Sequence, residues 1–202
     1  MYVSFFLFDV NSVFVFADFC HVTLDPNTAN DKLELSVDKR TVTNVEQLQL
    51  SPSHQDRFSS CPQVLSSTAL TGRCYWEVET RGSVDVAVSY RGIRRRGDAE
   101  DCRFGDNDQS WSLRRDGGGG WSVYHCKRNT NCGYVTSMYR VHRVGVFLDS
   151  EAGALSFYQV RHDNSLFLLH SFICSFSEPL FVGFGLVAPG SSVSLLEPKM
   201  RR

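Results

Sequence analysis

A chain of 202 residues with 42% hydrophobic and 12% aromatic side chains can bury one well-packed core and is rather short for two. Its formal net charge of -1, from 21 Lys and Arg against 22 Asp and Glu, argues against a general affinity for nucleic acid or an anionic membrane. Fifteen Phe and fifteen Gly favour short strands and tight turns over helices. We therefore expect one all-β domain.

The first twenty residues are rich in Phe and Val but carry no Lys or Arg, and Asp9, Asn11 and Asp18 interrupt them. A signal peptide needs a basic n-region, and a membrane-spanning helix needs about 20 nearly uninterrupted apolar residues. We therefore expect residues 1–21 to form an extra edge strand or a leader outside the domain. Secretion or membrane insertion is the less favoured alternative.

The next part of the chain predicts one turn of helix and then strands. Asp25 stands where an N-cap would lie and Pro26 at the first helical position, so a short helical turn is expected before a strand near residue 33. Residues 74–79 alternate between apolar and polar side chains, and the alternation resumes at residues 84–88 after a turn at residues 81–83. This pattern predicts a hairpin with one solvated face.

Three later segments complete the predicted sheets. "SWSLRRDGGGGWSVYHC" reads as a second hairpin, and "RVGVFLDSEAGALSFYQV" as a third, in which Gly153 supplies the positive φ of the turn. "EPLFVGFGLV" and "SVSLLEP" supply two closing strands. We therefore predict an antiparallel two-sheet β-sandwich. Its core is expected to include Trp76, Leu148, Phe157 and Phe184.

The cysteines indicate a reduced protein. There are seven, an odd number, and no C-x-x-C pair is present, so neither a disulfide framework nor a zinc ribbon is indicated. A combination of Cys20-His21, His125-Cys126 and Cys132 matches no known zinc-ligand spacing. We therefore expect free, mostly packed thiols, a reducing cytosol and no metal.

Patterns that would indicate catalysis or cofactor binding are incomplete. Arg94-Arg95-Arg96 and the acidic residues after it come with no nucleophile and base pair. The glycine run 117–120 lacks the Lys and Ser or Thr of a phosphate loop, and residues 106–110 lack the terminal Glu of a calcium loop. The six His are scattered. We expect no enzyme activity and no cofactor.

Six strings occur in the order found in PRY-SPRY domains, also called B30.2 domains. They are "LDPNTANDKLELS", "DRFSSCPQVL", "LTGRCYWEVE", "SWSL", "VGVFLDSEAGALSFY" and "EPLFVGFGL". The chain from about residue 22 to 198 resembles this family, and most closely its fish branch, in tripartite-motif proteins, NOD-like receptors and stonustoxin-type toxins. The resemblance implies a distorted β-sandwich of the SPRY type, with a PRY portion at 22–70 packed on a SPRY portion at 71–198.

The resemblance also implies that loops at one end of the sandwich bind protein partners. It places these loops at residues 91–97 and 114–120, where arginines supply planar, multi-donor guanidinium groups. An arginine run taken alone is more often a solvated loop. The predicted partner-binding residues are Arg91, Arg94, Arg95, Arg96, Arg114, Arg115, Asp116 and Tyr124.

Two functions stay open at this point. The first is a cytoplasmic, non-enzymatic interaction module that recognises a protein ligand in innate-immune sensing or ubiquitin-ligase targeting. The second is the C-terminal domain of a secreted, stonustoxin-like pore-forming toxin subunit. A partner of either kind is a protein, and neither nucleic acid nor membrane is expected for this domain alone.

Overall fold

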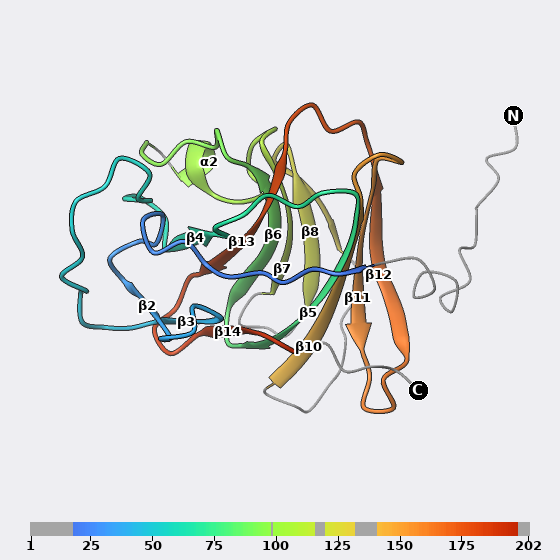
Figure 1. The fold of residues 1–202 in the computed structure, drawn as a ribbon, viewed down its shortest axis with the longest axis horizontal. Helices are drawn as coiled ribbons and strands as arrows, with labels where there is room; N and C mark the ends of the chain where they lie inside the picture. Colours follow the sequence, from blue (N-terminus) through green and yellow to red (C-terminus); the bar gives the residue numbers. More distant parts are fainter. Residues whose placement is uncertain (1–17, 98, 116–119, 132–140, 198–202) are drawn as a thin grey trace, which may run out of the picture.

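A computed structural model describes residues 18–97, 99–115, 120–131 and 141–197, and it confirms the all-β sandwich of two antiparallel sheets (Figure 1). The first sheet has the strand order β12-β11-β10-β5-β14-β3-β2, and β1 pairs in parallel with one end of β5. Its strands are β1 (Asp18–Phe19), β2 (Leu33–Leu35), β3 (Thr41–Asn44), β5 (Arg73–Arg81), β10 (Val141–Asp149), β11 (Ala154–Val160), β12 (Leu166–Ile173) and β14 (Ser192–Leu195).

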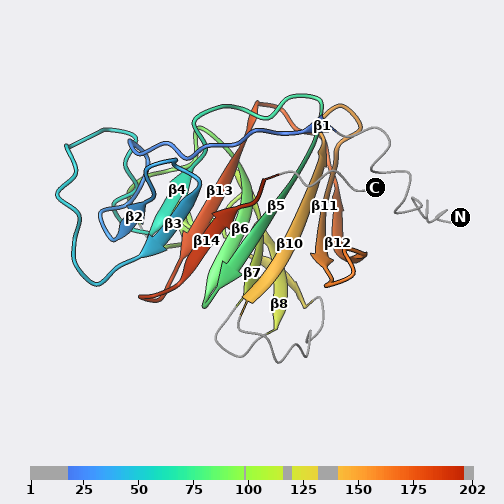
Figure 2. The same cartoon turned by 60° about the horizontal axis from the view of Figure 1, so that its bottom comes forward.

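The second sheet has the order β4-β13-β6-β7-β8-β9 and packs face to face on the first (Figure 2). Its strands are β4 (Gln63–Leu65), β6 (Val84–Tyr90), β7 (Ser110–Arg115), β8 (Trp121–His125), β9 (Arg128–Asn131) and β13 (Leu180–Leu186). A single helical turn, α2 (Ala99–Cys102), lies in the connection between β6 and β7. The helical turn expected near Asp25 is instead a non-helical turn, in which Asp25 accepts a hydrogen bond from the backbone N–H of Asn27 at 3.0 Å.

The predicted hairpin at residues 143–160 is confirmed. β10 pairs with β11 in antiparallel register, with Arg143 opposite Val160 at one end and Asp149 opposite Ala154 at the other. β10 also pairs with β5 along its whole length. Gly153 has the predicted positive φ of 70°, and a Cβ on it would come within 2.1 Å of the carbonyl oxygen of Cys174. The hairpin therefore forms part of the sheet framework.

The expected hairpin of residues 74–88 is wrong. β5 and β6 are consecutive in the chain but belong to different sheets, so the turn at Gly82 carries the chain across the sandwich. Every residue of β6 is buried, which also contradicts the expected solvated face. β6 is buried on both sides because a long connection covers its outer side. The periodicity within one strand carries no information about such a cover.

The main core lies between the sheets and contains the four predicted residues. Trp76 is 3% exposed, and Leu148, Phe157 and Phe184 are each 0% exposed. Inward-facing side chains of both sheets form one contiguous cluster. Burial of an aromatic or large aliphatic side chain contributes about 1.5–3 kcal/mol, so this cluster is the main source of stability.

A second, smaller core lies on the outer side of the second sheet. The connection between β6 and β7 folds back over the sheet, and its Phe104 is fully buried against Phe58 and Leu65. Gly183 in β13 makes room for this ring, because a Cβ there would lie 2.6 Å from Phe104 Cζ. Phe58 belongs to the N-terminal third of the chain, so the small core attaches that part to the second sheet.

The cysteine expectation is wrong for one pair. Cys20 and Cys74 form a disulfide, with their Cα atoms 5.4 Å apart. β1 aligns the two cysteines, since Asp18 lies opposite Cys74 and Phe19 opposite Tyr75. The odd number of cysteines hid this pair, because the partners are 54 positions apart and only strand pairing brings them together. The other described cysteines, Cys61, Cys102, Cys126 and Cys174, form no disulfide.

Candidate functional site

The two predicted arginine loops lie at opposite ends of the second sheet. β7 is antiparallel to β6, with Ser110 opposite Ser89 at one end and Arg115 opposite Val84 at the other. The residues after Tyr90 are therefore at the end where α2 lies, which we call the loop end, and Arg115 is beside the β5–β6 turn (Figure 1). The expectation that both loops share one end is wrong, because a strand between them reverses the chain direction.

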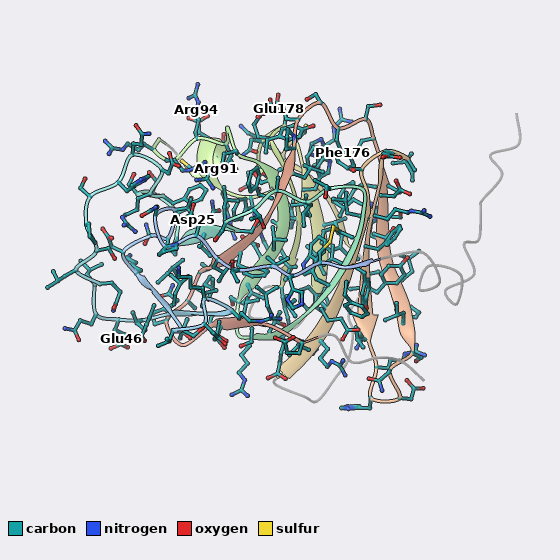
Figure 3. All side chains as sticks on the ribbon, viewed as in Figure 1. Asp25, Glu46, Arg91, Arg94, Phe176 and Glu178 are labelled. Atoms are coloured by element: carbon teal, nitrogen blue, oxygen red, sulfur yellow. A yellow bond between two sulfur atoms is a disulfide. The ribbon has the colours of Figure 1, made fainter. Side chains whose placement is uncertain are left out.

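Arg91 connects the N-terminal part of the chain to the loop end. Its guanidinium lies 3.0 Å from the carboxylate of Asp25 and 2.8 Å from that of Asp56, and it lies over the ring of Phe181. Arg91 and Asp25 are labelled in Figure 3. The hydrogen bond from Arg91 holds the pKa of Asp56 below its ordinary value. This arginine is engaged within the domain on both sides, so its contribution is to a large extent structural.

Arg95 is likewise engaged. Its guanidinium stacks over the ring of Phe58 at 4.5 Å and donates to the backbone carbonyls of Asp56, Ile93 and Arg91. Desolvation by burial is the main cause that lowers the pKa of Arg95. A guanidinium that satisfies three carbonyls and packs on an aromatic ring holds the loop in one shape.

Arg94 and Arg96 are the exposed members of this run. The Arg94 side chain is 72% exposed, and its one ion pair with the described residues is a 3.2 Å contact with Asp101. Figure 3 shows Arg94 pointing away from the domain. Arg96 is exposed as well. These two guanidinium groups are therefore available to a partner, whereas Arg91 and Arg95 position the loop that carries them.

Arg114 lies in a nearly buried charge cluster on the outer side of the second sheet. Its guanidinium is 2.7 Å from Asp85 and 3.2 Å from Asp106, and its side chain is only 12% exposed. Arg103 approaches the same Asp85 carboxylate at 3.5 Å. Burial favours the neutral form of Asp85 and raises its pKa, and the two arginines oppose this rise. Gly185 leaves the space for the carboxylate, since a Cβ there would lie 3.0 Å from it.

The remaining predicted residues are Tyr124, Arg115 and Asp116. Tyr124 lies under the guanidinium of Arg114, with 4.0 Å between the Arg114 Cζ and the ring centre. Arg115 donates to the carbonyl oxygen of Gly82 at 3.2 Å, at the end away from α2. Asp116 lies outside the described residues. Arg114 and Tyr124 therefore form a structural stack.

Sequence reasoning missed an aromatic group at the loop end. His125 stacks on Trp111 with 4.6 Å between ring centres, and Phe176 meets the same indole edge-on at 5.1 Å. Phe172 contacts His125 from the other sheet, and His125, Phe172 and Phe176 are each only half-buried. The alternating aromatics of "SFICSF" were a signal for this group, although their contact with Trp111 needs the closed sandwich.

Phe176 belongs to the connection from β12 to β13, which also carries the exposed Glu178. Figure 3 shows Phe176, Glu178 and Arg94 along the same end of the domain. The backbone N–H of Ser177 donates to the hydroxyl of Tyr90 at 3.0 Å, which holds this connection against the end of β6. The candidate site is therefore this end, with Arg94, Arg96, His125, Phe172, Phe176 and Glu178 as its accessible residues.

The described residues offer little that resembles another kind of site. They hold no group of three or more His, Cys, Asp or Glu side chains arranged for a metal ion. No helix within these ranges is long and apolar enough to cross a membrane. An open, polar cleft of about 720 Å³ lies beside the disulfide, lined by Cys20, Thr71, Gly72, Arg73, Asp149, Glu151 and Ala152.

Known proteins similar to this chain include toxin subunits and tripartite motif-containing proteins. Residues 22–70 match the SPRY-associated PRY family and residues 73–199 match the SPRY domain family. Stonustoxin subunit alpha of Synanceia horrida is 36% identical over 87% of this chain and 25% of its own length. Tripartite motif-containing protein 16 of Mus musculus is 33% identical over 88% of this chain and 32% of its own length. The chain thus spans only a quarter to a third of these relatives.

Solved structures give the same result. The stonustoxin structure superposes with a TM-score of 0.80 and 34% identity, covering 88% of this chain and 29% of that one. The PSpry domain of TRIM65 superposes with a TM-score of 0.78 and 25% identity, covering 93% of this chain and 95% of that one. The family matches and the shared sandwich together show that this chain belongs to the PRY-SPRY family.

Proposed function

We propose that this domain is a non-enzymatic protein-interaction module whose loop end binds the ligand. One observation carries the proposal: exposed arginines and half-buried aromatic rings occur together at an end whose loops are hydrogen-bonded to the rest of the fold. Arg94 is exposed beside an internally satisfied Arg95, and Phe176 is half-buried against Trp111. Aromatic and arginine side chains dominate binding energy at protein interfaces.

The exposed charges favour a ligand with carboxylates that meet Arg94 and Arg96 and with an apolar group that covers Phe176. Arg and carboxylate pair through parallel N–H···O bonds, which fix the orientation of the partner. At the rim of such an interface, charge mainly accelerates association and makes it depend on salt. The binding surface is thus smaller than the eight predicted residues, since Arg91, Arg95 and Arg114 have their partners within the domain.

The likeness to tripartite motif-containing proteins 14 and 16 supports a cytoplasmic setting in innate-immune sensing or ubiquitin-ligase targeting. A second candidate is a C-terminal domain of a secreted toxin subunit, favoured by the likeness to the stonustoxin subunits and by the Cys20–Cys74 disulfide. The coding sequence around this segment distinguishes them: RING, B-box and coiled-coil segments, or a nucleotide-binding domain with leucine-rich repeats, support the first.

The test is proximity labelling or a pull-down with the isolated domain, followed by titration of the captured protein at two salt concentrations. Arg94→Ala with Arg96→Ala is expected to weaken binding by about tenfold or more and to flatten its salt dependence. Arg161→Ala is the matched control, because Arg161 is an exposed arginine at the opposite end. Equal affinity of the double variant and the control at both salts would move the binding site away from the loop end.

A further inference from the structure

The disulfide between Cys20 and Cys74 holds a very short strand on the first sheet. β1 contains only Asp18 and Phe19, which pair with the first part of β5. The backbone N–H of Cys20 donates to the carbonyl oxygen of Tyr75 at 3.1 Å, and the ring of Phe19 meets that of Tyr75 edge-on at 5.4 Å. Pairing over two residues opens locally at little cost in free energy unless a crosslink holds it.

The two sulfurs of this disulfide differ in their access to solvent. Cys20 is half-buried and lines the open cleft of about 720 Å³, whereas Cys74 is 1% exposed and is not among the residues that line the cleft. A dissolved thiol therefore reaches the disulfide from the cleft, at the Cys20 sulfur. The Cys74 sulfur lies 3.5 Å from the carbonyl oxygen of Thr71, so a thiol formed there has a hydrogen-bond acceptor in place.

We propose that a dithiol reduces this disulfide through the cleft and thereby releases β1 from β5. One thiolate of the dithiol attacks the Cys20 sulfur, the bond between Cys20 and Cys74 breaks, and Cys74 leaves as a thiolate that takes up a proton. The second thiolate of the dithiol then attacks the reductant's own sulfur in the mixed disulfide, which closes the reductant's disulfide and frees Cys20. In sum, the dithiol loses two electrons and two protons, and the two cysteines gain them.

The contacts of β5 indicate that reduction leaves the two sheets in place. β5 pairs with β10 over its whole length and with β14 at the end away from β1. Cys74 is also part of the main core. The loss is therefore confined to the pairing of residues 18–20, and the reduced domain is expected to keep the same sandwich with β1 detached.

The inference does not depend on the ligand of the loop end, but it bears on the two proposed settings. Disulfides persist in oxidising compartments, whereas the reductants of the cytosol keep thiols reduced. The crosslinked form is therefore expected in a secreted protein, and the form with β1 released is expected in a cytoplasmic one.

The first experiment measures reduction of the disulfide in the native full chain. The protein is incubated with dithiothreitol at pH 8 and alkylated, and mass spectrometry identifies the modified cysteines. Cys61 is the internal reference for opening of the fold, because it is 6% exposed and forms no disulfide. We expect alkylation of Cys20 to require dithiothreitol and then to be at least tenfold faster than that of Cys61.

Two outcomes of this experiment would overturn the proposal. If Cys20 and Cys61 were alkylated at equal rates, reduction would require the fold to open as a whole, and attack through the cleft would be wrong. If Cys20 were alkylated at the same rate without dithiothreitol, there would be no crosslink to reduce.

Hydrogen exchange then tests the release of β1. The amide of Cys20 is expected to exchange at least tenfold faster after reduction, while peptides from β10 and β11 keep their protection. Cys20→Ser is expected to show the fast exchange at residues 18–20 without reductant. Cys126→Ser, which removes an exposed thiol outside the disulfide, is expected to respond as the parent does. Unchanged exchange at residues 18–20 after complete reduction, or loss of protection in β10, would contradict a release confined to β1.

Discussion

The arginines at the two ends of the second sheet have the same side chain but differ in exposure and in their partners. At the loop end, the run from Arg91 to Arg96 alternates between arginines held inside the domain and arginines open to solvent. At the other end of β7, Arg114 is almost fully covered and serves a buried carboxylate. The difference arises from the neighbours, because distant segments bring Asp25, Asp56 and Asp85 to some guanidinium groups and not to others.

Removal of the buried carboxylate is expected to have the largest effect on stability. Asp85→Ala leaves Arg114 and Arg103 without their shared partner, and we expect a loss of about 3–5 kcal/mol in the free energy of unfolding. Denaturant unfolding measures the change, with Asp108→Ala as the control, because Asp108 is an exposed acid in the same connection. If the two variants unfolded at the same denaturant concentration, the charge cluster would not contribute to stability.

Arg91→Ala tests the engaged half of the loop end. It removes two ion pairs and the contact with Phe181, and we expect a loss of about 1–2 kcal/mol, since the side chain keeps 34% exposure and solvent screens its pairs. Thermal unfolding of Arg91→Ala beside Arg94→Ala gives the measurement. A larger loss of stability for Arg94→Ala than for Arg91→Ala would contradict the assignment of Arg91 as structural and of Arg94 as exposed and available to a partner.

The pH dependence of stability tests the same ion pair without removing the arginine. The hydrogen bond from Arg91 lowers the pKa of Asp56 in the folded protein below its ordinary value of 3.8. This pair therefore contributes stability above about pH 3.8 and loses that contribution as the pH falls through the folded value. At pH 6, Asp56→Asn is expected to be less stable than the parent by less than about 1 kcal/mol in the free energy of unfolding. This difference should shrink as the pH falls below the pKa of Asp56 in the folded protein. A gap that stayed constant would assign the effect to packing.

The smallest stability effect is expected for the exposed pair. Arg94→Ala with Arg96→Ala removes side chains with little buried area, so the change in the free energy of unfolding should stay within about 0.5 kcal/mol. Far-UV circular dichroism and thermal unfolding check that the variant is intact before its ligand affinity is measured. A loss above 1 kcal/mol would show that these two arginines also hold the loop.

The sandwich, its framework hairpin and its main core follow from local pattern. Residues 144–148 and 155–157 alternate with the period of a strand, and one buried face is enough to select that register. The predicted core residues Trp76 and Phe184 are buried for this reason. A two-residue period is a property of a few neighbouring residues, so the sequence alone was sufficient to predict it.

Other features depend on contacts between distant segments, so they could be recognised only in the folded protein. The disulfide of Cys20 with Cys74 needs the pairing of β1 with β5, and the burial of every residue of β6 needs the connection that covers its outer side. The same holds for the candidate site. The sequence shows where arginines and aromatics occur. Which of them remain exposed depends on carboxylates and rings from far along the chain, because ion pairs and packing act through space over a few ångströms.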